Sequence, residues 1–419
     1  MKKVLLFALI AALALNSVFA NGSSELASSD GRTQVTVALW AADRGDRLER
    51  SEAEFEASHP DIDINFQVQS GDYSNYLGAK TAANDLADIY LLTPYAQVMT
   101  FAQAGRIQDL SDVPFVSEVY PESLESASYD GKVYGYPANY EFLGVYYNRD
   151  IFEACGITEV PTTRSEFIQV CETLQANGYQ PIASTFKESW TLKHLFSILL
   201  TTVVQDDIPG FIDSLNSGEG TFNVDGIDEV FAFADILRQY SGANYKDMDS
   251  TSGYNALANG SAAMLISGEF SLSALDNISN PPDIGLFAVP VSENPERNKL
   301  AVDVGQVFVV NAEPGNQEAT MEVLDFLSDG SLENGYVAIM SNEIGSAPPA
   351  MPFNFTFDCQ AYADYLAYAD AGNTVPWVYQ QFANGFDVVS GDIFQAYVFG
   401  AKDQATVLSE LDEAYKTFI

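Results

Sequence analysis

The sequence has few basic residues and few histidines, and each shortage excludes a class of function. Its 419 residues contain 19 lysines and arginines against 58 aspartates and glutamates, which gives a formal charge of −39 at pH 7. Nucleic acids and anionic lipid surfaces are bound by basic patches, so we predict that this protein binds neither. The only histidines are His59 and His194, which leaves almost no material for a histidine-based catalytic triad or zinc site. We expect His59 to cap a helix or face solvent, and His194 to be a core residue.

Several chemical motifs are also missing. The chain has no Gly-x-x-x-x-Gly-Lys-Ser/Thr, Gly-x-Ser-x-Gly or His-Glu-x-x-His sequence, so nothing indicates a phosphate-binding loop, a nucleophile elbow or a zinc protease. Its cysteines, Cys155, Cys171 and Cys359, have no Cys-x-x-Cys spacing. A Cys155–Cys171 disulfide and three free thiols both fit the sequence, and we favour the free thiols. We predict no metal ion and no cofactor.

The one long apolar run lies at the N-terminus. Lys2 and Lys3 precede an unbroken apolar segment, residues 4–15, which is too short to span a bilayer. Small residues near position 20 then supply a cleavage site, so residues 1–20 are predicted to be a signal peptide and residues 21–31 a flexible leader. The residue directly after the predicted cleavage site is not a cysteine, which argues against a lipid anchor. We therefore expect a periplasmic or secreted protein, and its strong charge favours a monomer.

Alternating strand and helix patterns fill the rest of the chain, which is longer than one core usually supports. Strands are expected at 35–40, 62–68 and 88–92, separated by helices at 43–58, 73–83 and 94–104, and this rhythm predicts a parallel sheet. Later strands are expected at 133–147, 262–267, 284–289 and 304–311. Further helices are expected at 149–154, 163–177, 190–204, 227–240, 317–327 and 406–418. Thr162 or Thr163 caps the second of these, with Glu166 in the capping-box position.

Four short segments agree with one known family in order and spacing. Two of them read Tyr134-Gly135-Tyr136-Pro137-Ala138-Asn139 and Val145-Tyr146-Tyr147-Asn148-Arg149-Asp150-Ile151-Phe152. The others are the helix-to-strand link at 55–62 and the segment Gly260-Ser261-Ala262-Ala263-Met264, which is followed by Gly268-Glu269-Phe270. Together they resemble the extracellular solute-binding proteins of ABC importers, in the carbohydrate type that includes maltose-binding protein. Phe270 stands where that family usually has tryptophan.

The resemblance implies an α/β fold of two lobes joined by a hinge, the type II periplasmic binding protein-like fold, with a ligand held between the lobes. By analogy, lobe 1 comprises residues 32–144 plus 281–331, and lobe 2 comprises residues 145–280 plus 332–419. The resemblance also implies a partner, an ABC permease in the inner membrane. Such a protein carries out no chemistry, so we expect no enzymatic activity.

Sugar binding requires aromatic rings for the apolar faces of the sugar, and planar polar groups for its hydroxyls. These residue types are expected where strands end, because ligands of parallel sheets bind there. The resemblance places Asn139, Tyr140 and Glu141 at the hinge and turns Trp190 toward the ligand. Each candidate also has a structural interpretation, as a core residue, a helix cap or a turn. The candidate ligand-binding residues are Trp40, Asp43, Thr93, Tyr95, Asn139, Tyr140, Glu141, Trp190, Glu269, Phe270, Asp303, Gly305, Gln306 and Trp377.

The candidate set contains no arginine or lysine, although an anionic ligand would need one. We therefore predict a neutral sugar or oligosaccharide. Two alternatives stay open. The same fold can bind a non-sugar solute such as a polyamine, which the negative charge would attract. A secreted carbohydrate-active enzyme would need a carboxyl group of raised pKa in the cleft, and nothing in the sequence singles one out.

Overall fold

The computed structural model describes residues 31–40, 46–69, 73–342, 345–353 and 359–419. The predicted signal peptide, most of the predicted leader and the candidate Asp43 lie outside the described residues. Within the described part, no single helix is long and apolar enough to cross a membrane. Helices α7 (Ser189–Val204) and α8 (Ile208–Asn216) meet that test only as a pair, which is bent by 110°.

The first group of elements begins with a parallel sheet, as its alternating sequence predicts. Strand β1 (Thr33–Trp40) pairs in parallel with β2 (Ile62–Gln69) and with β3 (Ile89–Leu92). Ile62 and Ile64 are buried, so one face of β2 packs on the core. The remaining helices and strands of this group are α2 (Arg47–Ser58), α3 (Tyr73–Ala83), α4 (Ala96–Gln103), β4 (Ser128–Tyr129), β5 (Lys132–Val133), α11 (Gln317–Ser328) and α12 (Tyr336–Ser341).

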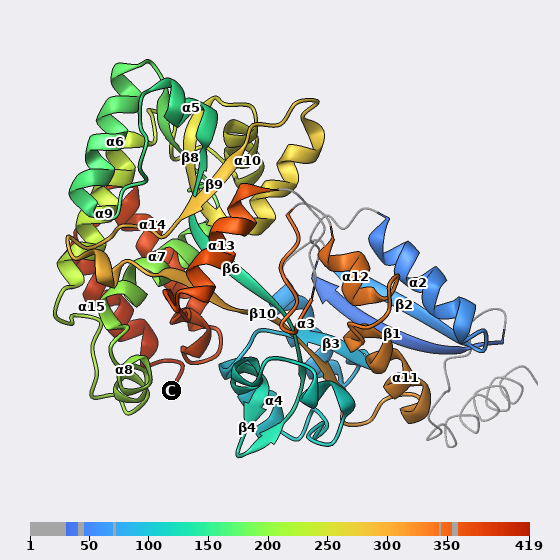
Figure 1. The fold of residues 1–419 in the computed structure, drawn as a ribbon. Helices are drawn as coiled ribbons and strands as arrows, with labels where there is room; N and C mark the ends of the chain where they lie inside the picture. Colours follow the sequence, from blue (N-terminus) through green and yellow to red (C-terminus); the bar gives the residue numbers. More distant parts are fainter. Residues whose placement is uncertain (1–30, 41–45, 70–72, 343–344, 354–358) are drawn as a thin grey trace, which may run out of the picture.

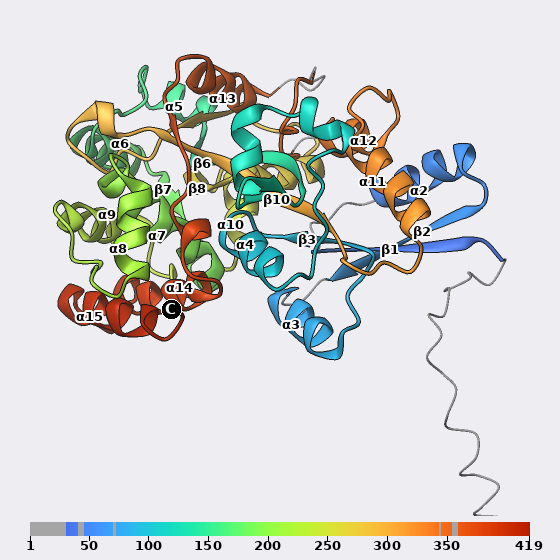
Figure 2. The same cartoon turned by 90° about the horizontal axis from the view of Figure 1, so that it is seen from below.

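Two long antiparallel strands connect the first group to the second. They are β6 (Tyr136–Asn148) and β10 (Leu300–Val310), which lie side by side in one sheet of order β2-β1-β3-β10-β6-β8-β7. Figure 1 shows both strands running between the two groups, and Figure 2 shows α2 and α15 (Gln404–Tyr415) on opposite sides of the molecule. The register of β6 and β10 shifts on both sides of Gln306, beside Gly305. The irregular stretch therefore lies midway between the two groups.

The second group packs helices around the far end of the same sheet. Strand β8 (Ala262–Gly268) pairs with β6 and β7 (Gln180–Ala183), while β9 (Ile284–Phe287) pairs with β6 and β11 (Thr374–Val375) pairs with β10. Apolar residues of α7 form much of the largest hydrophobic cluster. The other helices are α5 (Arg149–Ala154), α6 (Arg164–Ala176), α9 (Ile227–Tyr240), α10 (Ser250–Ala258), α13 (Gln360–Asp370), α14 (Phe386–Val398) and α15.

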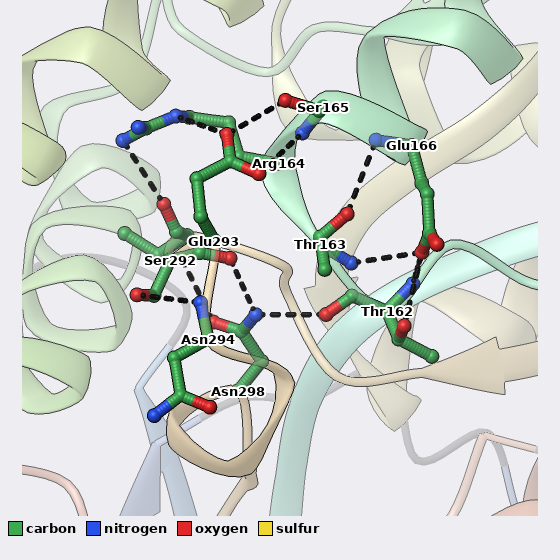
Figure 3. Close-up of polar contacts among 10 residues, drawn as sticks. Thr162, Thr163, Arg164, Ser165, Glu166, Ser292, Glu293, Asn294 and Asn298 are labelled. Atoms are coloured by element: carbon green, nitrogen blue, oxygen red, sulfur yellow. Dashed lines mark hydrogen bonds and ion pairs between the residues drawn. The ribbon is translucent and has the colours of Figure 1, made fainter.

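The packing of residues 284–301 differs from the lobe assignment expected from the sequence. Strand β9 and the start of β10 share hydrophobic clusters with the second group, not the first. The loop that joins them is tied to the N-terminus of α6: Asn298 Nδ2 donates to the Thr162 carbonyl (2.9 Å), and Ser165 Oγ donates to Glu293 (2.8 Å) (Figure 3). Conversely, α12 packs in the core of the first group. The lobe boundaries stay a prediction, and this packing favours a boundary inside β10.

The sequence predicted the helix bounds more accurately than the directions in which the strands pair. Helix α6 carries the predicted capping box between Thr163 and Glu166, and its bounds differ from the prediction by one residue at each end. The predicted parallel arrangement is confirmed for β1, β2 and β3, whereas β6 pairs antiparallel with β10, β8 and β9. The sheet is therefore mixed. The three cysteines are free, as favoured.

Candidate functional site

Four aromatic rings from three separate segments surround His194. Trp190 and His194 lie one turn apart in the first half of α7, with ring centroids 5.6 Å apart. Phe270 follows β8 in a 3₁₀ helix, and its ring lies 6.2 Å from Trp190 and 6.4 Å from His194. Trp377 and Tyr379 follow β11, with rings 6.2 and 5.3 Å from His194. Three segments that lie far apart in the chain, around residues 190–194, 270 and 377–379, thus form one aromatic cluster.

A small pocket of about 10 Å³, room for the centre of about one water molecule, lies beside this cluster. Its lining includes Trp190, His194 and Phe270, together with Thr185 and Ser267. The side chain of Trp190 is 38 % exposed, whereas the side chains of Trp377 and Tyr379 are buried. Trp190 therefore offers a ring to an incoming molecule, and the other rings form the base beneath it. No carboxylate is among the described lining residues.

Lys193 and Asp387 brace the base of the aromatic cluster. The Lys193 ammonium lies 4.9 Å from the centre of the Tyr379 ring and pairs with the Asp387 carboxylate at 3.0 Å. The Tyr379 ring in turn stacks on Trp377, with centroids 5.6 Å apart and planes inclined by 17°. Both partners of the ion pair are largely buried, so this lysine is already neutralised and does not offer a free charge to a ligand.

Asp303 ties together segments from both groups of elements. One carboxylate oxygen accepts hydrogen bonds from the Tyr95 hydroxyl and the Val304 backbone N–H, both at 2.8 Å. The other oxygen accepts from the Trp377 backbone N–H at 3.0 Å. Burial raises the pKa of Asp303 to about 7, although the three donors oppose this rise. Tyr95 has a backbone φ of 57°, which is rare for a residue with a side chain and shows that its position is held by its surroundings.

Two glutamates lie next to this point, opposite the irregular stretch of β10. Glu269 is 2 % exposed and accepts a hydrogen bond from the Phe142 backbone N–H at 3.1 Å. Burial, and then the nearby Glu141 carboxylate, raise the pKa of Glu269 well above its ordinary value, which favours its protonated form. Gly305 has the Glu141 side chain directly against it: a Cβ at Gly305 would lie 2.4 Å from the Glu141 carboxyl carbon. Glycine at this position therefore leaves the space that the Glu141 side chain occupies.

Several buried polar atoms near these strands have no hydrogen-bond partner among the described residues. They include Asn139 Oδ1, Trp377 Nε1 and Gln380 Oε1, and the Tyr140 hydroxyl in β6 is a fourth. The Gln380 amide nitrogen donates to the Val304 carbonyl at 3.1 Å, which holds this side chain against β10. An unpaired buried polar atom is costly, so such atoms gather where water or a ligand completes the hydrogen bonding.

The other candidates in the first group have mainly local partners. The Trp40 ring lies edge-on to Tyr73 at 5.2 Å. The Thr93 backbone N–H and hydroxyl both donate to Gln97, at 2.8 and 3.1 Å, as in the turn interpretation. Tyr140 and Gln306 belong to the two connecting strands, and Gln306 is buried. The contacts described for Trp40 and Thr93 are local ones. The candidates that the structure brings into contact with one another or with shared neighbours are Tyr95, Glu141, Trp190, Glu269, Phe270, Asp303, Gly305 and Trp377.

Sequence reasoning missed two members of the aromatic cluster. His194 was expected to be a core residue, but it is only half-buried and lines the pocket. Tyr379 was not among the candidates. The only sequence signal for His194 was its spacing of four residues from Trp190, which places both side chains on one face of a helix.

One group of acids has the spacing of a metal site but is already occupied by an arginine. Ligand atoms of Glu52, Glu56 and Asp63 lie within 4.8 Å of one another. Arg32 pairs with Glu56 at 2.7 Å and with Asp63 at 3.0 Å. This guanidinium takes the place that a cation would fill. The expected absence of a metal stays a prediction.

The fold is that of a two-lobed solute-binding protein. A sequence model of the bacterial extracellular solute-binding proteins matches residues 41–329, which is more than half of the chain. The chain therefore belongs to the bacterial extracellular solute-binding protein family. This is a family of binding proteins that act outside the cytoplasm.

Similar proteins of known name point the same way. The multiple sugar-binding protein of Streptococcus mutans is 23 % identical over 69 % of this chain and 70 % of its own length. The melibiose/raffinose/stachyose-binding protein MelE of Bacillus subtilis is 29 % identical over 37 % of this chain and 36 % of its own. The crystal structure of a sugar transporter of Bacillus licheniformis in complex with stachyose matches with a TM-score of 0.76 and 17 % identity, covering 92 % of this chain and all of the other.

Proposed function

We propose that this protein binds a neutral sugar or oligosaccharide between its lobes and delivers it to an ABC permease in the inner membrane. The observation that carries the proposal is the aromatic cluster around His194, with the half-exposed Trp190 ring at its mouth. The apolar C–H face of a sugar ring packs well on such a ring, and buried polar atoms nearby suit its hydroxyls.

The charges near the pocket support a neutral ligand. The nearest cation, Lys193, is paired with Asp387, so it gives no clamp for an anion. Glu269 and Asp303 are buried, burial raises the pKa of both, and no carboxylate is among the described lining residues, so the pocket offers no acid cage for a polyamine. The names of the relatives add support, because they describe binding of multiple sugars, of melibiose, raffinose and stachyose, and a complex with stachyose.

Glu269 has a raised pKa and lies beside Glu141, and a glycosidase also uses a pair of carboxyl groups, one of which has a raised pKa. Such an acid must reach the glycosidic oxygen of the substrate. Glu269 is 2 % exposed, bonds a backbone N–H and is not in the lining of the pocket, so its position supports a structural role. We therefore propose binding without turnover. The signal peptide at residues 1–20, delivery to the periplasm and the monomeric state belong to the same proposal.

A thermal-shift screen of the chain from residue 21 tests this function. The probes are raffinose, stachyose, melibiose, an acidic sugar and spermidine. A ligand at about one hundred times its Kd adds about 2.7 kcal/mol to the free energy of unfolding. We expect stabilisation by one or more neutral sugars, with the sugar recovered intact after hours. Stabilisation by spermidine alone would overturn the ligand class, and consumption of the sugar would overturn the binding role.

A matched pair of variants locates the ligand. Trp190→Ala should weaken sugar binding at least tenfold, because it removes the exposed ring at the pocket. The control is Phe418→Ala, whose side chain is exposed to the same degree (37 % against 38 %) but packs on Phe386 near the C-terminus. Equal loss of affinity in both variants would show that Trp190 does not contact the sugar.

A further inference from the structure

The imidazole of His194 is the least explained polar group in the pocket. It is half-buried, it lines the pocket, and four aromatic rings lie within 6.4 Å of it, measured between ring centroids. A histidine that serves only packing normally has a hydrogen-bond partner for at least one ring nitrogen. Among the described residues, none donates a hydrogen bond to this imidazole or accepts one from it.

The other polar side chain of the same helix face is already used. The Thr191 hydroxyl lies 2.9 Å from the Thr185 carbonyl and 2.8 Å from the Glu188 carbonyl. Its hydrogen-bonding capacity thus serves the first turn of α7 and not the pocket. On this face of α7, His194 is therefore the side chain with both a donor and an acceptor to spare.

The imidazole is held in its neutral form. Burial lowers the pKa of His194 well below its ordinary value, and the neighbouring Lys193 ammonium adds to this effect. A neutral imidazole has one N–H donor and one bare nitrogen that accepts. A hydroxyl group also donates once and accepts, whereas an ammonium group only donates. The ring in this pocket is thus matched to a hydroxyl-bearing ligand.

We infer that His194 is a specificity-determining residue, which holds a hydroxyl of the ligand at the base of the aromatic pocket through its otherwise unused ring nitrogens. This inference rests on the proposed sugar-binding function and deepens it. The aromatic rings accept any flat apolar face, so they discriminate little among sugars. The hydrogen bond to His194 supplies discrimination, because a ligand without a hydroxyl there leaves a buried polar group unpaired.

Two substitutions separate hydrogen bonding from packing. His194→Phe keeps a planar ring among the aromatic residues but has no nitrogen, while His194→Gln keeps a donor and an acceptor. Isothermal titration uses whichever of raffinose, stachyose and melibiose binds the wild-type protein most tightly. We expect His194→Phe to weaken binding about tenfold or more, and His194→Gln to recover part of the loss. The control His59→Phe replaces the other histidine, which stacks on Phe55 at the end of α2, and should leave the affinity unchanged.

A second measurement uses the wild-type protein and does not depend on how the variants fold. The chain has two histidines, so the imidazole NMR signals of protein labelled at histidine are few, and His59→Phe assigns them. Saturation with the same sugar should shift the ring-nitrogen signals of His194 and leave those of His59 in place.

The outcomes distinguish failure of this inference from failure of the proposed function. If the wild-type protein binds none of the three sugars, the proposed function fails, and the inference fails with it. If the wild-type protein binds a sugar, but His194→Phe binds it equally well or the His194 signals do not move, the inference alone is overturned. An equal loss of affinity in His194→Phe and His194→Gln would assign His194 to packing and also overturn it.

Discussion

Replacing Asp303 by asparagine tests how strongly burial acts on the carboxyl group that links the two groups of elements. Asp303 is 5 % exposed, and burial raises its pKa from 3.8 to about 7. The folded state therefore holds a proton that the unfolded chain releases above its ordinary pKa. This proton stabilises the folded state fully below about pH 4, and its contribution is lost as the pH rises to about 7.

The size of the effect follows from the difference between the two pKa values. Each pKa unit corresponds to about 1.4 kcal/mol, so the total over the interval is about 4 kcal/mol. The amide of Asp303→Asn does not titrate in this range, so the variant lacks the contribution of the bound proton. The substitution also turns an NH₂ group toward a hydrogen-bond donor, either the Trp377 N–H or the Tyr95 hydroxyl. That mismatch costs about 1–3 kcal/mol at every pH. The free energy of unfolding of the wild-type protein, minus that of the variant, should therefore fall by about 1.4 kcal/mol per unit between about pH 5 and 7, and then level off.

Denaturant titrations of both proteins over this range measure that difference. The control is Asp109→Asn, because Asp109 is exposed and its hydrogen bonds with Lys132 and Ser111 lower its pKa to about 2. Asp109 is ionised throughout the range, so its variant should differ from the wild-type protein by a constant amount. A constant difference for Asp303→Asn as well would refute the reasoning, because it would mean that the three hydrogen bonds outweigh burial and keep the carboxylate ionised.

Three further substitutions test other parts of the structure. Gly305→Ala places a Cβ 2.4 Å from the carboxyl carbon of Glu141, so it should lower both the melting temperature and the sugar affinity. The control is Gly78→Ala in α3, where a Cβ meets nothing within 4 Å. This control should add about 0.5–1 kcal/mol to the free energy of unfolding in denaturant titrations. Thr163→Ala removes the capping box of α6 and should cost about 1 kcal/mol in the same assay, and an unchanged value would mean that Glu166 alone satisfies the helix end. Glu269→Gln keeps the acceptor and the neutral charge of a protonated carboxyl group, so the melting temperature at pH 7 should barely change; a large loss would show that the group is ionised.

Local features were predictable because their causes lie within a few residues. The bounds 149–154 and 227–240 agree with the prediction, and the capping box of α6 needs only residues 163–166. Family membership was also predictable, because short segments in a fixed order carry it.

The site could not be predicted in the same way, because it is built from contacts between residues far apart in the chain. Local sequence patterns do not show which distant residues come into contact. Asp303 meets Tyr95 across 208 residues and Trp377 across 74. The direction of β6 in the sheet, and the packing of 284–301 with the second group, follow from long-range pairing that helix and strand periodicity does not encode.

The sequence alone determined the class of this protein: an acidic α/β chain with the segments of the extracellular solute-binding family and many aromatic residues. The tertiary structure decided which of those residues act together. It placed His194 in the pocket lining and not in the core, and it placed Glu269 in the core beside Glu141. The physical reason is that burial sets the charge of an ionisable group and the partners left to it, and burial is a property of the packed chain.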